Sequence, residues 1–187
     1  MTITLLQLWM PIVAASVIAW LASGLIHMVI KYHNSDFQKI ENEDEVMTAV
    51  GQGSPSLGLH HFPHCADMSE MANEDMQQKM IKGPVGILVM FPNGLPNMGK
   101  YLGQQFAYFL VGTALIAYCA TLVLLPGAEF LTVFRFFSAV GFIAFGWACI
   151  PYSIWFGFQW SMTAKYLLDA LIYALVVAAT FAWLWPT

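Results

Sequence analysis

Four long stretches with almost no charged side chains constrain what this chain can fold into. They cover residues 5–30, 101–125, 130–155 and 162–185. A helix needs about 20 apolar residues to cross the ~30 Å hydrocarbon core of a bilayer, and each stretch is longer than that. Only 10% of the 187 residues are charged, whereas soluble domains average about 25%. We therefore expect an all-α membrane protein, a four-transmembrane-helix bundle that forms a single membrane domain over residues 1–187.

A polar segment of 69 residues, 32–100, separates the first two stretches. It holds nine of the eleven acidic residues and is divided by Pro55, Pro63, Pro84, Pro92 and Pro96. A short helix is predicted over 43–50, stopped by Gly51, and a second over 69–82, which has acids early, lysines late and Gly83-Pro84 at its end. The apolar run 85–91 is too short to span and indicates either a strand or a segment at the membrane surface.

The cations predict the orientation of the four spans. Six of the seven lie on or near the side that carries the 32–100 loop: Lys31, Lys39, Lys79, Lys82, Lys100 and Lys165. Only Arg135 lies near the opposite side. By the positive-inside rule, the 32–100 loop is cytoplasmic and both termini are extracytoplasmic.

Several classes of function lack support in the sequence. The net charge is −4 and no basic patch occurs, so we expect no nucleic-acid partner. Three cysteines do not make a disulfide framework. No nucleophile elbow, phosphate-binding glycine loop or helical metalloprotease motif is present, which favours a protein without catalytic activity.

One loop segment is rich in side chains that bind metals. Within eight residues it holds His60, His61, His64, Cys65 and Asp67, and Met68 follows. These side chains are ligand types for zinc or copper. Their spacing matches no standard zinc module, and Pro63 prevents a regular helix. The alternative is a polar loop whose histidines cap turns.

Ionisable residues also occur at membrane depth. His27 and Asp169 lie at similar depth near the loop side of the first and fourth spans, and Lys165 is one helical turn from Asp169. Such residues are costly in lipid and usually face the interior of a bundle. We expect a cluster of these three side chains, which either forms a proton or ligand site or simply pins the first helix to the fourth.

The fourth span carries alanines at every fourth position, which places them on one helix face: Ala170, Ala174, Ala178 and Ala182. Small-residue ridges let helix backbones approach closely where lipid supplies no hydrophobic drive. We predict that this ridge is a buried helix contact.

Four segments carry a resemblance to known proteins: Trp9-Met10-Pro11 leading to His27-Met28, Pro63-His64-Cys65, Gly83-Pro84-Val85-Gly86, and Ala164-Lys165-Tyr166-Leu167-Leu168-Asp169-Ala170 leading to Trp185. Together they resemble uncharacterised families of small bacterial inner-membrane proteins with four helices and a long first loop. The resemblance implies a location in the bacterial inner membrane and no particular activity.

The leading expectation for function is a non-catalytic accessory or scaffold subunit. It would contact the lipid bilayer and other membrane subunits, or form a homo-oligomer. One alternative is a metal- or redox-linked membrane protein that uses the segment His60–Met68. Another is a small proton-coupled transporter built around His27 and Asp169.

Overall fold

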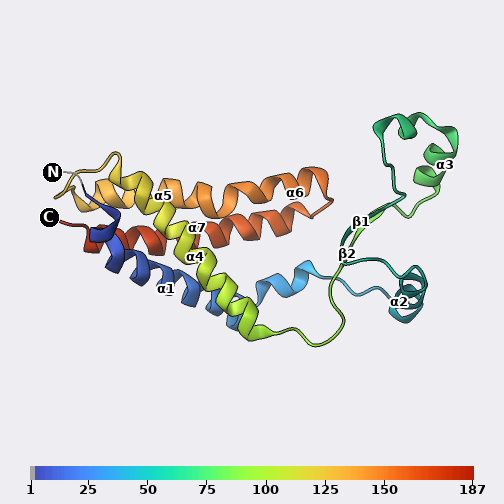
Figure 1. Cartoon of the computed structure of the whole chain (residues 1–187), viewed down its shortest axis with the longest axis horizontal. Helices are drawn as coiled ribbons and strands as arrows, with labels where there is room; N and C mark the ends of the chain where they lie inside the picture. Colours follow the sequence, from blue (N-terminus) through green and yellow to red (C-terminus); the bar gives the residue numbers. More distant parts are fainter. Residues whose placement is uncertain (1–2) are drawn as a thin grey trace. The chain divides into compact units, whose positions relative to one another are not determined.

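The computed structural model describes residues 3–187, and its main elements are long helices (Figure 1). The principal ones are α1 (Trp9–Gly24), α4 (Met98–Thr121), α5 (Phe130–Gly146), α6 (Ile150–Trp155) and α7 (Trp160–Leu184). A π-helical stretch, Leu25–Ile30, continues α1, and a 3-10 turn joins α5 to α6. The all-α fold class fits this architecture.

Within residues 3–187, four helical segments are long and apolar enough to cross a membrane: Leu5–Ile30, Met98–Thr121, Phe130–Trp155 and Trp160–Leu184. Their mean hydropathies are 2.0, 1.2, 1.8 and 2.1, so Met98–Thr121 is the least apolar of them. These segments indicate a multi-pass membrane protein.

The second of these helices differs in its bounds from the expected 101–125. It begins at Met98 because the Asn97 side chain accepts a hydrogen bond from the Lys100 backbone N–H at 3.1 Å, which caps the first turn. It ends at Thr121 in a turn that precedes Pro126, and the residue before a proline is disfavoured in helical conformation.

The chain divides into two compact units. The helical unit comprises the chain through Gln38 together with Asn97–Thr187, and the loop unit comprises Lys39–Pro96. The prediction of a single membrane domain stays a prediction, because a compact unit of structure is not necessarily a domain that folds independently.

Within the helical unit, α7 packs against both α5 and α1, and α4 packs mainly against α1 (Figure 1). The core contains Phe109, Phe137 and Phe181, all fully buried. The rings of Phe137 and Phe181 stack across α5 and α7 with centroids 4.1 Å apart. Such pairs add to the stabilisation that burial provides.

Small residues bring α5 and α7 close together. The four ridge alanines of α7 are between 0% and 9% exposed. A Cβ atom added at Gly141 would lie 3.1 Å from the Cβ of Ala174, and one added at Gly146 would lie 2.5 Å from that of Ala170. Glycines on α5 therefore face the alanines on α7, a close approach that suits helices in lipid.

The loop unit contains α2 (Glu43–Gln52), β1 (Gly58–Phe62), α3 (Glu74–Lys82) and β2 (Gly86–Met90). Both expected short helices are present, although the second divides into a 3-10 turn at Met68–Ala72 and α3, because Asn73 caps a new helix. The 85–91 run forms a strand, β2. It pairs antiparallel with β1, with Gly58 opposite Met90 and Phe62 opposite Gly86, and β1 was not expected.

Candidate functional site: a polar cluster at one end of the helical unit

A buried carboxylate on α7 organises the site. Asp169 is only 3% exposed. Its Oδ1 accepts a hydrogen bond from the Tyr32 hydroxyl, and its Oδ2 lies 2.9 Å from His33 Nε2. Both partners come from the 3-10 helix Tyr32–Asp36, which follows the first span. Two donors thus compensate the buried charge of Asp169, as a buried carboxylate requires.

The backbone conformation of Lys31 places these partners. The π-helical stretch ends with the Lys31 N–H bonded to the Ile26 carbonyl at 2.8 Å, and Lys31 adopts a left-handed conformation with φ of 58°. A left-handed residue is a common way to end a helix, although a residue other than glycine is unusual there. The chain therefore turns sharply and brings Tyr32 and His33 onto α7.

His33 bridges two carboxylates. Its Nδ1 lies 2.8 Å from Asp36 Oδ2, while its Nε2 faces Asp169. An ionised carboxylate only accepts hydrogen bonds, so with both acids ionised each ring nitrogen donates and the imidazole is positively charged. Since His33 is only 7% exposed, the charge-assisted bonds on both sides hold the ring in one orientation.

Lys165 completes the charge balance. Its ammonium forms an ion pair with Asp36 and donates to the Tyr32 carbonyl at 2.9 Å and the Ser35 hydroxyl at 2.8 Å. Burial raises the pKa of Asp36, but hydrogen bonds and charge from Lys165 and His33 lower it by more, so the net pKa lies below its usual value. Lys165 and His33 therefore connect the two carboxylates Asp36 and Asp169 in one closed network.

His27 lies at the edge of this network. Its Nδ1 is 3.0 Å from the Ser23 carbonyl, its Nε2 is 3.9 Å from Asp169 Oδ2, and its side chain is 44% exposed. The rings of His27 and His33 are stacked, with centroids 4.9 Å apart and planes 7° from parallel.

The structure thus brings His27 and Asp169 to the same place, although 3.9 Å is longer than a hydrogen bond. It also places Lys165 beside them, but the ammonium contacts Asp36 and not Asp169. The ammonium is instead held by the 3-10 helix Tyr32–Asp36, which supplies the Asp36 carboxylate, the Tyr32 carbonyl and the Ser35 hydroxyl.

The sequence interpretation missed Tyr32, His33 and Asp36. A histidine and an acid three residues apart, directly after the first span, are the signal that was available. It was overlooked because this segment was assigned to the polar loop.

Within residues 3–187, the loop residues predicted as metal ligands do not form hydrogen bonds with one another; three of them form hydrogen bonds with nearby backbone groups instead. His60 and His61 are neighbours on β1, so their side chains point to opposite faces of the hairpin. Their ring nitrogens bond backbone carbonyls, at Ser56 (2.8 Å) and Pro63 (2.9 Å). Asp67 caps a turn by accepting from the Ser69 N–H at 2.9 Å.

The remaining proposed ligands, His64 and Cys65, lie in the connection between β1 and the following 3-10 turn. Cys65 is a free, partly exposed thiol. These placements match the alternative reading, in which the polar side chains of the segment serve turns.

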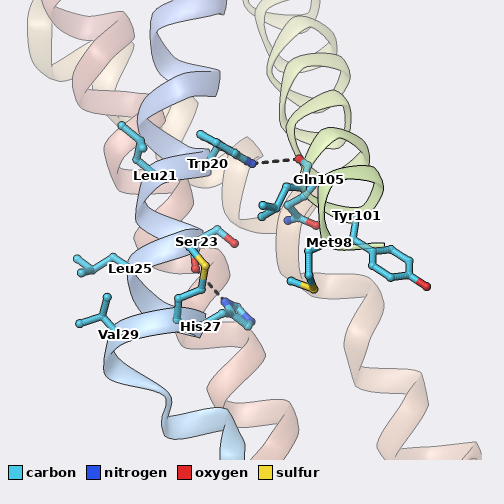
Figure 2. A pocket seen from close by; sticks show the side chains of 12 residues that line it. Trp20, Leu21, Ser23, Leu25, His27, Val29, Met98, Tyr101 and Gln105 are labelled. Carbon is cyan, nitrogen blue, oxygen red and sulfur yellow. Dashed lines mark hydrogen bonds between the residues drawn. The ribbon is translucent and has the colours of Figure 1, made fainter. Parts of the chain in front are cut away.

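Two pockets meet at the polar cluster. The first has a volume of about 540 Å³ and lies between α1 with its π-helical continuation and the start of α4; Figure 2 shows its lining side chains. Most are apolar, and Ser23, His27 and Gln105 add polar groups. The Trp20 indole donates to the Leu102 carbonyl at 3.2 Å and ties α1 to α4 at this pocket (Figure 2).

The second pocket, of about 400 Å³, is lined by a more polar set of side chains that includes Tyr108, Tyr166, Asp169 and Tyr173. His27 and Gln105 line both pockets. An apolar pocket and a tyrosine-lined pocket with more polar groups therefore share one wall, a combination suited to a molecule with an apolar part and a polar part.

Comparison with protein-family models, with curated proteins and with solved structures found no match for this chain.

Proposed function

We propose that this chain is a non-catalytic, multi-pass protein of the bacterial inner membrane that binds an amphipathic molecule from the bilayer, as an accessory subunit of a larger assembly or of a homo-oligomer. The observation that carries the proposal is the pair of pockets that share His27 and Gln105.

The two pockets fit the two parts of such a ligand. The pocket between α1 and α4 has the volume of small-molecule sites, which run from about 300 to 1,000 Å³, and is lined mainly by aliphatic and aromatic side chains. An acyl or isoprenoid chain suits this lining. The tyrosine-rich pocket next to it offers hydroxyl groups for a polar head. His27 and Gln105 stand between them, where the head joins the chain.

A binding role suits the site better than catalysis. The charged groups Asp36, Lys165, His33 and Asp169 are engaged with one another. A general base must reach the proton that it abstracts, and a nucleophile needs a base beside it. Asp36, Lys165 and His33 line neither pocket, so they are not placed to meet a ligand bound there. The same pairing argues against the transporter alternative, since a proton path needs exchangeable carriers.

The proposed topology keeps both termini outside the cytoplasm and the 32–100 loop inside it. The support is the six-to-one division of cations between the two sides. A membrane-impermeant thiol reagent applied to intact cells should label a cysteine placed at the C-terminus. Labelling of a cysteine within the loop, with protection at the C-terminus, would reverse the orientation.

Native mass spectrometry of the protein extracted in mild detergent tests ligand binding. Gly24 lines the apolar pocket, and a Cβ atom added there has only the flexible end of Met28 within 4 Å, at 3.1 Å. Gly24→Phe should therefore fill the pocket and abolish a bound mass that the wild type carries. Gly103→Phe is the matched control, because Gly103 is on α4 with no atom within 4 Å of an added Cβ. Equal retention of the mass in both variants, or no bound mass in the wild type, would overturn the proposal.

A further inference from the structure

We propose that His27, His33 and Asp169 form a binding site for a divalent metal ion of the zinc class. The site would lie within the helical unit, where α7 meets the end of the first span, and not in the histidine-rich loop segment. This inference goes beyond the proposed ligand binding and does not depend on it.

The positions of the ligand atoms support the proposal. One atom from each residue can be chosen such that all three lie within 4.8 Å of one another. The Asp169 Oδ2 atom is 2.9 Å from His33 Nε2 and 3.9 Å from His27 Nε2. Ligands about 2.1 Å from a tetrahedral zinc ion are separated by about 3.4 Å. The observed separations lie on both sides of this value, so the ligand atoms are near the spacing of a zinc site and side-chain movement would complete it.

Each proposed ligand is also oriented by a second partner. His33 Nδ1 faces the Asp36 carboxylate at 2.8 Å, and His27 Nδ1 faces the Ser23 carbonyl at 3.0 Å. The other carboxylate oxygen of Asp169, Oδ1, accepts a hydrogen bond from the Tyr32 hydroxyl. In metal sites, a ligating histidine commonly donates its other N–H to a carboxylate or a backbone carbonyl. Both histidines follow this arrangement, which leaves Nε2 of each directed toward Asp169.

The ligand types select the class of metal. Two imidazoles and one carboxylate suit zinc and other divalent first-row ions, whereas copper(I) prefers thiolates and thioethers. No cysteine belongs to this group of ligands. The three residues leave a coordination position for water or an anionic group, and the tyrosine-lined pocket gives access to it because His27 and Asp169 are part of its wall.

Metal binding requires two local changes. The metal takes the place of the proton between His33 Nε2 and Asp169, since a ligating nitrogen must present its lone pair. The His27 ring must also turn, because it stacks nearly parallel to the His33 ring and a metal lies in the plane of each imidazole that binds it. The His27 side chain is 44% exposed and lines both pockets, so it has room to turn.

Titration of the purified full-length chain with Co²⁺ tests the site, because cobalt replaces zinc and its absorption reports ligand type and geometry. We expect one equivalent of Co²⁺ to bind, and its absorption spectrum to indicate nitrogen and oxygen ligands. Zn²⁺ should displace the bound Co²⁺. His27→Gln is the main variant, because an exposed side chain tolerates substitution; it should weaken binding by at least tenfold, and His33→Gln should do the same.

The loop histidines supply the matched control. The double variant His60→Gln, His64→Gln should bind cobalt as the wild type does. Elution volume and circular dichroism show that each variant is folded. The proposal is overturned if the folded wild type binds no cobalt, if His27→Gln binds it unchanged, or if the loop variant alone abolishes binding. This test is separate from that of the proposed ligand, because it reads cobalt absorption and not a bound organic mass.

Discussion

The close contact between α5 and α7 lets the cost of one substitution be estimated from a distance in the structure. In Gly146→Ala, the new Cβ would lie 2.5 Å from the Cβ of Ala170. Carbon atoms in favourable contact are about 3.5–4.0 Å apart, so the helices must separate by about 1 Å. Overpacking of this kind typically costs about 1–3 kcal/mol. The intrinsic preference of helices for alanine offsets up to about 1 kcal/mol of that. We expect a net loss of about 1–2 kcal/mol in the free energy of unfolding.

Unfolding by SDS in mixed micelles, followed by circular dichroism, measures this loss. Gly103→Ala is the matched control, because an added Cβ there meets no atom within 4 Å. It should be neutral or stabilising by up to about 1 kcal/mol. Adding Ala170→Gly to Gly146→Ala should recover part of the loss, since it removes the clashing atom. If Gly146→Ala behaves like Gly103→Ala, or the second change gives no recovery, the close approach of the helices is wrong.

Three further predictions concern the polar cluster and the end of α7. His33→Leu and Asp169→Asn should each destabilise the protein in SDS titration, and their double-mutant cycle should show a coupling of about 0.5–3 kcal/mol. A cycle that pairs His27→Leu with Asp169→Asn should show a weaker coupling, because His27 Nε2 is 3.9 Å from Asp169 Oδ2. Strict additivity of the His33 and Asp169 variants would refute the network. The pKa of Asp36 is lowered on folding, so its stabilisation is present above the unfolded pKa of about 3.9 and is lost as the pH falls through the folded pKa. The difference in stability between wild type and Asp36→Asn should therefore shrink on acidification, and a difference that does not change as the pH falls below about 3.9 would contradict this. Trp185→Phe removes the hydrogen bond of 3.0 Å from the indole N–H to the Leu125 carbonyl and should lower the free energy of unfolding by about 1 kcal/mol in the same titration. An unchanged free energy of unfolding would mean that this hydrogen bond does not stabilise the fold.

The apolar spans could be predicted from the sequence because their signal is length and hydropathy, which need no knowledge of packing. Their ends depend on local hydrogen bonds. The start of α4 is set by the Asn97 side chain, and an asparagine in a proline-rich segment is not distinctive until the helix is seen. Strand β1 was missed because it contains His60 and His61, and its pairing with β2 joins segments more than 20 residues apart, a relation that no local pattern reveals.

The candidate site could be predicted only in part. His27 and Asp169 stand out because ionisable residues are rare in apolar stretches. Their partners Tyr32 and His33 reach α7 only because Lys31 adopts a left-handed conformation, which is uncommon for residues other than glycine. The sequence gives no sign of that reversal. The pockets depend on how α4 packs against α1, which is a tertiary property that hydropathy does not contain.

Site-specific photo-crosslinking in native membranes tests the central claim, which is the binding of a particular amphipathic molecule. A diazirine amino acid would replace Met28, which lines the apolar pocket, or Leu131 on α5, which is 57% exposed and lines neither of the two pockets. We predict that Met28 crosslinks are enriched in one molecular species, whereas Leu131 crosslinks reflect the bulk lipid composition. The same mixture of lipids at both positions would contradict the account.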